Sequence, residues 1–387
     1  MQNLELRKFD FIDATRGLAI LCVILVHSSQ SIAPLNATLA WLMSEGARGV
    51  QLFYIASALT LCMSWAARSQ IDKSPIRSFY IRRFFRIAPM FYLAILGSAL
   101  VNGLHANYWA PNGIEWWFFP ITATFLHGFH PETITSVVPG GWSIAVEMNF
   151  YLVLPLLLMF VRSMKTAGVL FAVSMLLYYV NLLLVPRMFS YPESQQYLVD
   201  SFAFLNFFGQ LPVFAIGIFG YFVLREKYSR ERIATFGGSV FLVLLALFLY
   251  PLYDFPSSFF AEQLLKPIHH IVAGALFCVF VIMLAYWPTG LLVNKVTIWL
   301  GKLSFSMYLL HFAVLKIFQK IGFIGALPKT NLGSILYFAG AVGVTFAVSF
   351  FTYQFVERPG IRLGAWLIQF LQLRSSTKPH LHRPERK

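Results

Sequence analysis

The composition places this chain in a membrane. Of its 387 residues, 58% are hydrophobic and only 12% are charged. The mean hydropathy of +0.67 excludes an ordinary water-soluble domain and is typical of a protein that crosses a bilayer several times. In such a protein the net charge of +14 indicates how the loops are oriented, because Lys and Arg accumulate on the cytoplasmic side, so no nucleic-acid partner is expected.

Apolar runs of about 20 residues, bounded by charged residues, predict the membrane spans. The run 114–129 is short and contains Pro120, so we expect an interfacial or re-entrant piece there rather than a span. The ten predicted spans are 14–32, 49–65, 87–105, 142–161, 166–185, 201–224, 235–252, 269–287, 298–318 and 334–356.

An even number of spans places both termini on one side of the membrane. If that side is cytoplasmic, the inner segments contain 22 Lys and Arg residues and the outer segments 6, as the positive-inside rule requires. The expected fold is therefore an all-α integral-membrane bundle of about ten transmembrane helices with the N-terminus and the C-terminus cytoplasmic. We assign 1–360 to the membrane domain and 361–387 to an interfacial helix with a basic cytoplasmic tail.

The first span carries two ionisable side chains, Arg16 and His27. Eleven helical steps of about 100° place them on one helix face, about 16 Å apart. Ionisable residues inside a span usually serve a function, because burying them is costly. An interfacial arginine with a packing histidine is the alternative, since an arginine near a helix end can reach water. Asp10, Asp13 and Arg16 argue against a cleavable signal peptide.

An arginine cluster precedes the third span, with the sequence RRFFRIAP at 82–89. In a helix, Arg82, Arg83 and Arg86 form one cationic face, with Arg77 upstream. Cations at a helix N-terminus oppose the helix dipole unless an anion binds there, and arginine side chains suit phosphates. The cluster therefore predicts a site for a cytosolic cofactor with several phosphates, and simple positive-inside bias is the alternative.

Three ionisable residues are expected at similar depth, nearer the outer side. Glu147 lies about 8 Å below the outer start of the fourth span, and His311 lies about 20 Å from the cytoplasmic start of the ninth, close to the depth of His27. A buried carboxylate needs a partner, and two imidazoles with a carboxylate can take a proton from a hydroxyl. A purely structural hydrogen-bonded network would also produce this layer.

Other polar residues give weaker signals. Cys22, Cys62 and Cys278 fall inside predicted spans without a metal-binding spacing, so we expect them to pack in the core and predict no metal site. Several outer residues are candidates for an acceptor-sugar site, although interfacial anchoring is the more common role of such side chains. They are Trp109, Trp116, Trp117, His127, His130, His269 and His270.

Ordered motifs over nearly the whole chain resemble the acyltransferase type 3 family of integral-membrane acyltransferases. Each motif alone is weak, but their order is specific, and the chain departs from the family at Ala58, where glycine is common. The motifs are DATRG at 13–17 followed by His27, GVQLFYIAS at 49–57, RRFFRIAP at 82–89, Trp142-Ser143 with Glu147 and Phe150-Tyr151, LSFSMYLLH at 303–311, and VERP at 356–359.

The resemblance implies transfer of an acyl group, usually acetyl, from cytosolic acyl-CoA to a hydroxyl of a cell-surface glycan or its lipid-linked precursor. We therefore expect acetyl-CoA or another short acyl-CoA as donor, contact with membrane lipids, and a place in the inner (cytoplasmic) membrane. The residues expected to bind CoA are Arg16, Arg77, Arg82, Arg83 and Arg86.

The resemblance also implies roles for the remaining motif residues. His27 is the expected general base or acyl carrier, and Glu147 is expected to orient or charge-balance an imidazole. His311 or Ser143 is expected to contact the developing oxyanion. The residues expected to contact the substrate are Asp13, Trp142, Ser143 and Tyr151.

Two other classes of protein remain as alternatives. A secondary transporter or exporter would use His27, Glu147 and His311 as a proton relay, but the sequence shows no inverted repeat, and an arginine cluster for phosphates has no natural role in that scheme. A purely structural subunit would leave the ionisable layer without a purpose. The acceptor, the acyl chain length and the oligomeric state are not encoded in any motif we identify.

Overall fold

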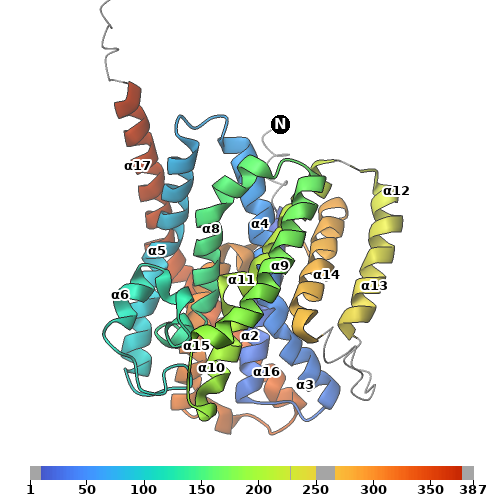
Figure 1. The fold of residues 1–387 in the computed structure, drawn as a ribbon. Coiled ribbons are helices and arrows are strands. Elements are labelled where there is room, and N and C mark those ends of the chain that lie inside the picture. The colour runs from blue at the N-terminus through green and yellow to red at the C-terminus, as the bar shows by residue number, and fades with distance from the viewer. Residues whose placement is uncertain (1–9, 227, 250–265, 377–387) are drawn as a thin grey trace, which may run out of the picture.

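The computed structural model describes residues 10–226, 228–249 and 266–376, which form a bundle of helices (Figure 1). The carboxylates of Asp10 and Asp13 lie in the first turn of the first helix, where they favour the helix dipole. The long helices are α2 (Asp10–Ser31), α4 (Gly49–Arg68), α5 (Pro75–Asn102), α8 (Trp142–Phe160), α9 (Met164–Met188), α11 (Phe207–Arg225), α14 (Lys266–Tyr286), α15 (Lys295–Lys320), α16 (Asn331–Thr352) and α17 (Arg358–Ser376).

Short helical elements connect or extend the long helices. They are α3 (Ala37–Ser44), η1 (Glu45–Arg48), α6 (Phe118–Ala123), η2 (Leu126–Phe129), α7 (Thr133–Ser136), η3 (Glu193–Gln195), α10 (Gln196–Leu205), α12 (Arg230–Arg232), η4 (Ile233–Gly237), α13 (Gly238–Leu249), η7 (Phe323–Ala326) and η8 (Tyr353–Glu357). The elements α3 and η1 run into α4, η3 and α10 run into α11, and η8 joins α16 to α17.

Nine helices within the described ranges are long and apolar enough to cross a membrane, against ten predicted spans. The difference lies at 235–252, where the chain forms η4 and α13, and residues 250–252 lie outside the described part. The region 114–129 contributes only the short elements α6 and η2. The protein is therefore helical and multi-pass, as predicted, while its number of spans and its orientation remain predictions.

Helix α5 begins at Pro75, twelve residues before the span predicted at 87–105. Proline suits this first position because the first backbone N–H groups of a helix have no intrahelical partner. Arg82, Arg83 and Arg86 consequently lie two or more turns inside the helix, where the backbone N–H groups are already hydrogen-bonded. The prediction that an anion binds these arginines together with free N–H groups of a helix N-terminus is wrong.

Helix α8 begins inside the bundle rather than at its surface. Gly140 and Gly141, which precede the helix, are buried, and Gly140 adopts a left-handed conformation with φ of 74°. A Cβ atom on Gly140 would lie 2.9 Å from the Phe312 ring and 3.2 Å from the hydroxyl oxygen of Tyr308. Glu147, in the second turn of α8, therefore lines a cavity within the bundle.

Glycines bring the first helix against a helix almost 300 residues away. A Cβ atom on Gly17 of α2 would collide with the carbonyl of Thr297, and one on Gly301 of α15 would collide with the carbonyl of Asp13. The two backbones can approach this closely only without side chains at these positions. The contact fixes the relative height of α2 and α15, the helices that carry His27 and His311.

A buried polar network supports the break between α10 and α11. The Oδ1 atom of Asn206 accepts a hydrogen bond from the Gly209 N–H at 2.9 Å, and its Nδ2 donates to Asn181 at 2.7 Å. Gln51 of α4 donates to Gln210 of α11 at 3.0 Å. These two amide pairs join α4 to α11 and α9 to the start of α11 through buried hydrogen bonds, which helps apolar spans to tolerate them, while Oε1 of Gln51 has no hydrogen-bond partner among the described residues.

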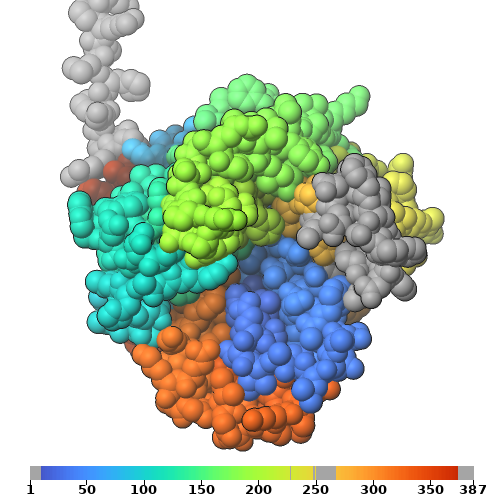
Figure 2. Space-filling model, turned by 60° about the horizontal axis from the view of Figure 1, so that its bottom comes forward, coloured from blue at the N-terminus to red at the C-terminus, as the bar shows by residue number. Residues whose placement is uncertain are grey.

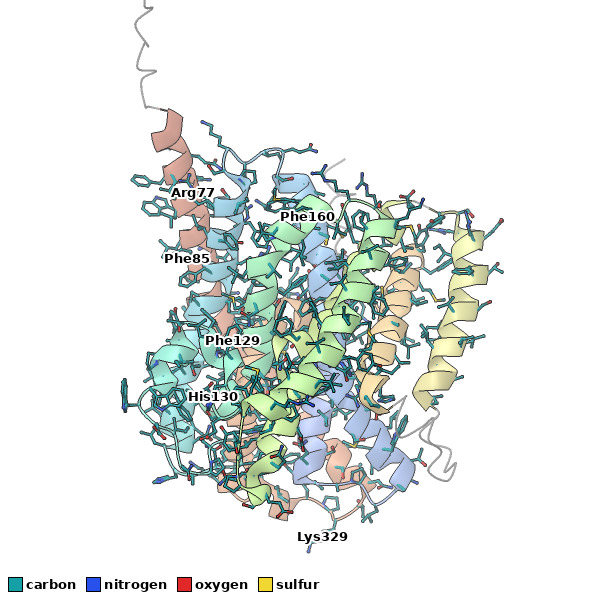
Figure 3. The ribbon with its side chains drawn as sticks, in the orientation of Figure 1. Arg77, Phe85, Phe129, His130, Phe160 and Lys329 are labelled. Carbon is teal, nitrogen blue, oxygen red and sulfur yellow. The ribbon has the colours of Figure 1, made fainter. Side chains whose placement is uncertain are left out.

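The two ends of the bundle differ. The start of α2 and the end of α17 lie at one end, which we call the terminal end (Figure 1). Arg77 lies at this end and Lys329 at the opposite end (Figure 3). At the opposite end, the segment 103–141, α10, the α2–α3 region and the chain around η7 meet around one face (Figure 2). The predicted orientation makes the terminal end cytoplasmic.

Candidate active site

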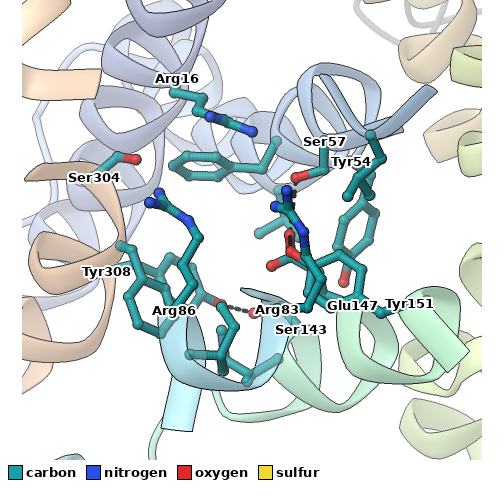
Figure 4. A pocket seen from close by; sticks show the side chains of 16 residues that line it. Arg16, Tyr54, Ser57, Arg83, Arg86, Ser143, Glu147, Tyr151, Ser304 and Tyr308 are labelled. Atoms are coloured by element: carbon teal, nitrogen blue, oxygen red, sulfur yellow. Dashed lines mark hydrogen bonds between the residues drawn. The ribbon is translucent and has the colours of Figure 1, made fainter. Parts of the chain in front are cut away.

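A cavity lies in the middle of the bundle between α2, α4, α5, α8 and α15 (Figure 4). We call it the central cavity. Arg16 enters it from α2, and Arg83 and Arg86 enter it from α5, facing Glu147 and Tyr151 of α8. Three guanidinium groups around one small space make it attractive to an anion. The other lining residues are Val50, Phe53, Tyr54, Ser57, Leu61, Ile87, Ser143, Ile144, Ser304, Phe305 and Tyr308.

A second, roomier cavity adjoins it toward the terminal end. We call it the entry chamber; its volume is about 490 Å³, compared with about 60 Å³ for the central cavity. Arg16, Arg83 and Arg86 line both spaces, so these three arginines stand where the two meet. The other residues of the entry chamber are Thr60, Arg68, Asp72, Arg82, Ile361, Ala365, Ile368, Gln369 and Gln372.

Arginine side chains are held in place by defined partners. Arg16 donates a hydrogen bond to the Thr60 hydroxyl at 3.2 Å. Arg82 pairs with Asp72 at 2.7 Å on the wall of the entry chamber. The guanidinium of Arg83 lies over the Tyr151 ring at 5.7 Å, and its Nε has no hydrogen-bond partner among the described residues. Arg83 therefore has donor capacity left for a ligand.

Glu147 accepts hydrogen bonds from two hydroxyls of the central cavity. Ser57 donates to it at 2.9 Å, and the Tyr151 hydroxyl donates to the same oxygen. Within the described structure it makes no hydrogen bond to an imidazole, so the predicted pairing with His27 or His311 is not present. The buried start of α8 explains this, because it places Glu147 beside the arginines instead.

Glu357 belongs to the VERP motif, but the sequence analysis assigned it no role in the site. It is completely buried at the junction of η8 and α17, pairs with Arg86 at 3.5 Å, and accepts a hydrogen bond from Ser306 at 3.0 Å. It thus ties α5, α15 and the C-terminal helices together at the arginine that lines both cavities. A lone carboxylate at the end of an apolar run was the available signal.

His27 and His311 come together near the opposite end of the bundle. Their ring centroids are 5.3 Å apart, and the Phe312 ring packs on both, at 4.4 Å from His27 and 4.1 Å from His311. The helical reasoning that placed both histidines at one depth therefore describes their position correctly. His311 is fully buried, whereas His27 is only partly covered.

The hydrogen bonds of the two histidines fix which ring nitrogen is free. Nδ1 of His27 lies 3.0 Å from Oε1 of Gln30, and Nδ1 of His311 lies 2.6 Å from the carbonyl of Tyr308. Both partner oxygens can only accept, so each Nδ1 carries the proton and each neutral ring presents an unprotonated Nε2. Nε2 of His311 is buried without a partner among the described residues.

Tyr308 stands between the central cavity and the histidines. It lines the cavity, its ring centroid lies 5.7 Å from that of His311, and its hydroxyl donates to the Gly140 carbonyl at 3.0 Å. Ser143 donates to the Tyr308 hydroxyl at 2.8 Å. His27 and His311 do not line the central cavity, so Tyr308, which lines it and contacts His311, connects the cavity with the histidine pair.

Comparison with known proteins identifies the family to which this chain belongs. A family model described as an acyltransferase domain matches residues 9–354. The chain belongs to the acyltransferase type 3 family. The motifs that suggested this family are therefore interpreted correctly, and nothing in the comparisons supports the transporter alternative.

Curated relatives are O-acetyltransferases by name. One provisionally named protein of Staphylococcus aureus (strain MRSA252) is 24% identical over 410 residues, which cover 98% of this acyltransferase chain and 61% of the relative. O-acetyltransferase OatA of the same strain is 24% identical over 394 residues, covering 94% and 59%. The chain thus spans about three-fifths of the length of these relatives. No solved structure matches it.

Some residues predicted to belong to the acyltransferase site lie elsewhere. Arg77 is exposed near the start of α5 and lines neither cavity, because it precedes the inward-facing arginines on the helix. Asp13 packs its backbone against Gly301, and Trp142 packs on the edge of Tyr54 at 6.3 Å. Neither Asp13 nor Trp142 lines the central cavity or the entry chamber, whereas Ser143 and Tyr151 line the central cavity.

Two of the histidines predicted to line an acceptor site are buried and hydrogen-bonded to backbone carbonyls. His127 is 1% exposed and donates to the Gly141 carbonyl at 3.0 Å, and burial lowers its pKa to about 4, so it is neutral at physiological pH. His270 is 2% exposed and bonds to the Gly209 carbonyl. Neither can contact an acceptor at the surface. In the described ranges, no group of three or more His, Cys, Asp or Glu could hold a metal ion.

Proposed function

We propose that this protein is a membrane O-acyltransferase that moves an acetyl or another short acyl group from cytosolic acyl-CoA to a hydroxyl of a cell-surface glycan or its lipid-linked precursor. One observation carries the proposal. Two cavities meet at Arg16, Arg83 and Arg86, and a histidine pair lies beyond the far end of the inner cavity. This layout suits a donor with a bulky anionic head and a slender reactive arm.

The arginines supply the donor site in this proposal. The phosphates of CoA lie in the entry chamber against Arg82, Arg83 and Arg86, because arginine side chains bind phosphate oxygens with paired hydrogen bonds. The uncharged pantetheine arm passes Arg16 into the central cavity and carries the thioester toward Tyr308. The small volume of this cavity excludes the nucleotide head group.

The histidine pair supplies the proton chemistry. Nε2 of His27 takes the proton of the acceptor hydroxyl as its oxygen attacks the thioester carbonyl carbon. The C–S bond then breaks, the acyl group remains on the acceptor, and the CoA thiolate takes up the proton that the imidazolium releases. The hydroxyl of Ser143, which lines the central cavity, can donate a hydrogen bond to the transient oxyanion, whereas the unprotonated Nε2 of His311 can only accept a proton.

Binding measurements on the purified protein test the donor. Arg83→Ala should weaken acyl-CoA binding by about 1.5–3 kcal/mol, the range for losing a charge-assisted hydrogen bond, and lysine should restore only part of it. Arg77→Ala is the matched control, because this arginine of the same helix lines neither cavity. Equal CoA affinity of wild type and Arg83→Ala would move the donor site elsewhere.

Mass spectrometry tests the acceptor. Surface glycans from cells with and without the gene should differ by an acyl mass increment, and cells carrying His27→Gln should resemble cells without the gene. Glycans of identical mass in all three would contradict a glycan acceptor while leaving the donor measurement unaffected.

A further inference from the structure

The entry chamber has two walls of different chemistry. Arginines of α2, α4 and α5 form one wall, and α17 forms the other with Ile361, Ala365, Ile368, Gln369 and Gln372. These α17 residues are spaced by four, three, one and three positions, so they share one helix face. The α17 wall carries no charge. The match to the family model ends at residue 354, before α17 begins.

Helix α17 is fixed firmly enough to form a binding wall. A Cβ atom on Gly360 would lie 2.7 Å from the Pro89 ring, and one on Gly364 would lie 2.7 Å from the Phe85 side chain, so α17 packs directly on α5. At its start, Glu357 pairs with Arg86. The helix that carries the uncharged wall is therefore joined to the helix that carries the arginines.

A ligand that contacts both walls must combine phosphates with an uncharged group. Phosphates belong on the arginine wall, because cations bind them and an apolar face would leave them unpaired. The aliphatic side chains of Ile361, Ala365 and Ile368 suit the flat face of an uncharged ring. The Gln369 amide has both a donor and an acceptor, which suits the edge of a nucleobase.

We propose that α17 is the base-recognition element of the donor site and selects the adenine of an acyl-CoA donor. Ile361, Ala365 and Ile368 contact the face of the base, and Gln369 hydrogen-bonds its edge. This inference rests on the proposed acyl-CoA donor. It assigns to α17 a part in donor selection that the arginines cannot perform, because phosphates are the same in every nucleotide.

The test compares two nucleotides that differ only in the base. Adenosine 3′,5′-bisphosphate and guanosine 3′,5′-bisphosphate are titrated into the purified full-length protein. Wild type should prefer the adenosine compound by about three- to tenfold, the value of one hydrogen bond to a base edge. Gln369→Ala should bring this ratio close to one, whereas Arg83→Ala should weaken both nucleotides and preserve the ratio.

A bulky side chain on the α17 wall of the entry chamber provides an independent test. Ala365→Trp should weaken CoA and adenosine 3′,5′-bisphosphate by at least about tenfold by occupying the space of the base. Leu363→Trp is the matched control, because Leu363 is 50% exposed and does not line the chamber. Detergent melting curves of both tryptophan variants should match wild type.

The outcomes separate this inference from the proposed donor. If Arg83→Ala weakens CoA binding while Gln369→Ala keeps the base preference and Ala365→Trp binds CoA normally, the donor proposal stands and α17 has no part in base recognition. If wild type binds neither CoA nor the bisphosphates, the donor proposal fails and the inference fails with it. A wild-type ratio of one would also overturn the inference.

Discussion

At the scale of single residues, the tautomer of His27 decides which of its ring nitrogens can take a proton. Gln30, one turn after His27, accepts from Nδ1 and leaves Nε2 free to take a proton. The sequence analysis predicted His27 as the base but did not single out Gln30, because its importance depends on side-chain orientation rather than on a motif. Glu147 was identified as a buried carboxylate, yet its partners, Ser57 and Tyr151, could not be read from spacing alone.

The first prediction separates proton transfer from packing. His27→Gln is close in size and still polar, so expression, melting behaviour and CoA binding should stay near wild type. Transfer should fall by at least about 100-fold, the low end for losing a general base. Gln30→Leu should lower transfer by less, since it only frees the ring to change tautomer. If His27→Gln keeps more than about half the wild-type rate, His311 becomes the candidate base.

The second prediction concerns the buried ion pair. Glu357→Gln keeps a partner for Ser306 but removes the charge opposite Arg86, so detergent melting should show a loss of about 1–3 kcal/mol. The loss stays moderate because the Arg86 side chain is 29% exposed. Glu193→Gln, at the exposed start of η3, is the control. Saturating CoA should recover part of the lost stability, and equal melting of both variants would show that the pair is not stabilising.

At the scale of elements, sequence patterns located helices better than helix ends. Apolar runs identify the long helices, because burial in lipid requires them. The early start of α5 was missed because 75–86 is too charged to resemble a span, although Pro75 is a recognised helix start. The sequence analysis placed the start of α8 at the outer surface. In the structure this start is buried, because segment 103–141 folds over it, and no sequence pattern indicates that contact. Both errors displaced the site residues that these helices carry.

The third prediction tests the contact between α2 and α15. Gly301→Ala places a methyl group against the Asp13 carbonyl and should cost about 1–3 kcal/mol, measured as a lower melting temperature in detergent. Gly343→Ala in α16 has open space around it and should be neutral or stabilising by up to about 1 kcal/mol. Equal effects at both positions would mean that the two backbones are not in close contact.

At the scale of the whole molecule, charge distribution predicts the orientation. Arg77 lies at the terminal end, and the segments predicted to be on the same side as the termini hold 22 Lys and Arg residues against 6 on the other side, so this end should face the cytoplasm. In a background without Cys22, Cys62 and Cys278, an impermeant thiol reagent applied to intact cells should label Ser194→Cys and not Lys165→Cys. Both positions are exposed; Lys165 lies in the first turn of α9, and Ser194 lies in η3, which follows the other end of α9. Labelling of Lys165→Cys in intact cells would reverse the orientation and place the entry chamber outside.

The long-range contacts also set when the site can exist during synthesis. Helices enter the membrane in chain order, so Arg16, Arg83 and Arg86 arrive long before α15 and Glu357. Until then α2 lacks the backbone surface that Gly301 offers, and Arg86 lacks its carboxylate. A ribosome that stops before residue 357 therefore leaves an inserted chain with cationic side chains in the bilayer and no reaction centre. Maturation of this protein is a late event that its last helices complete.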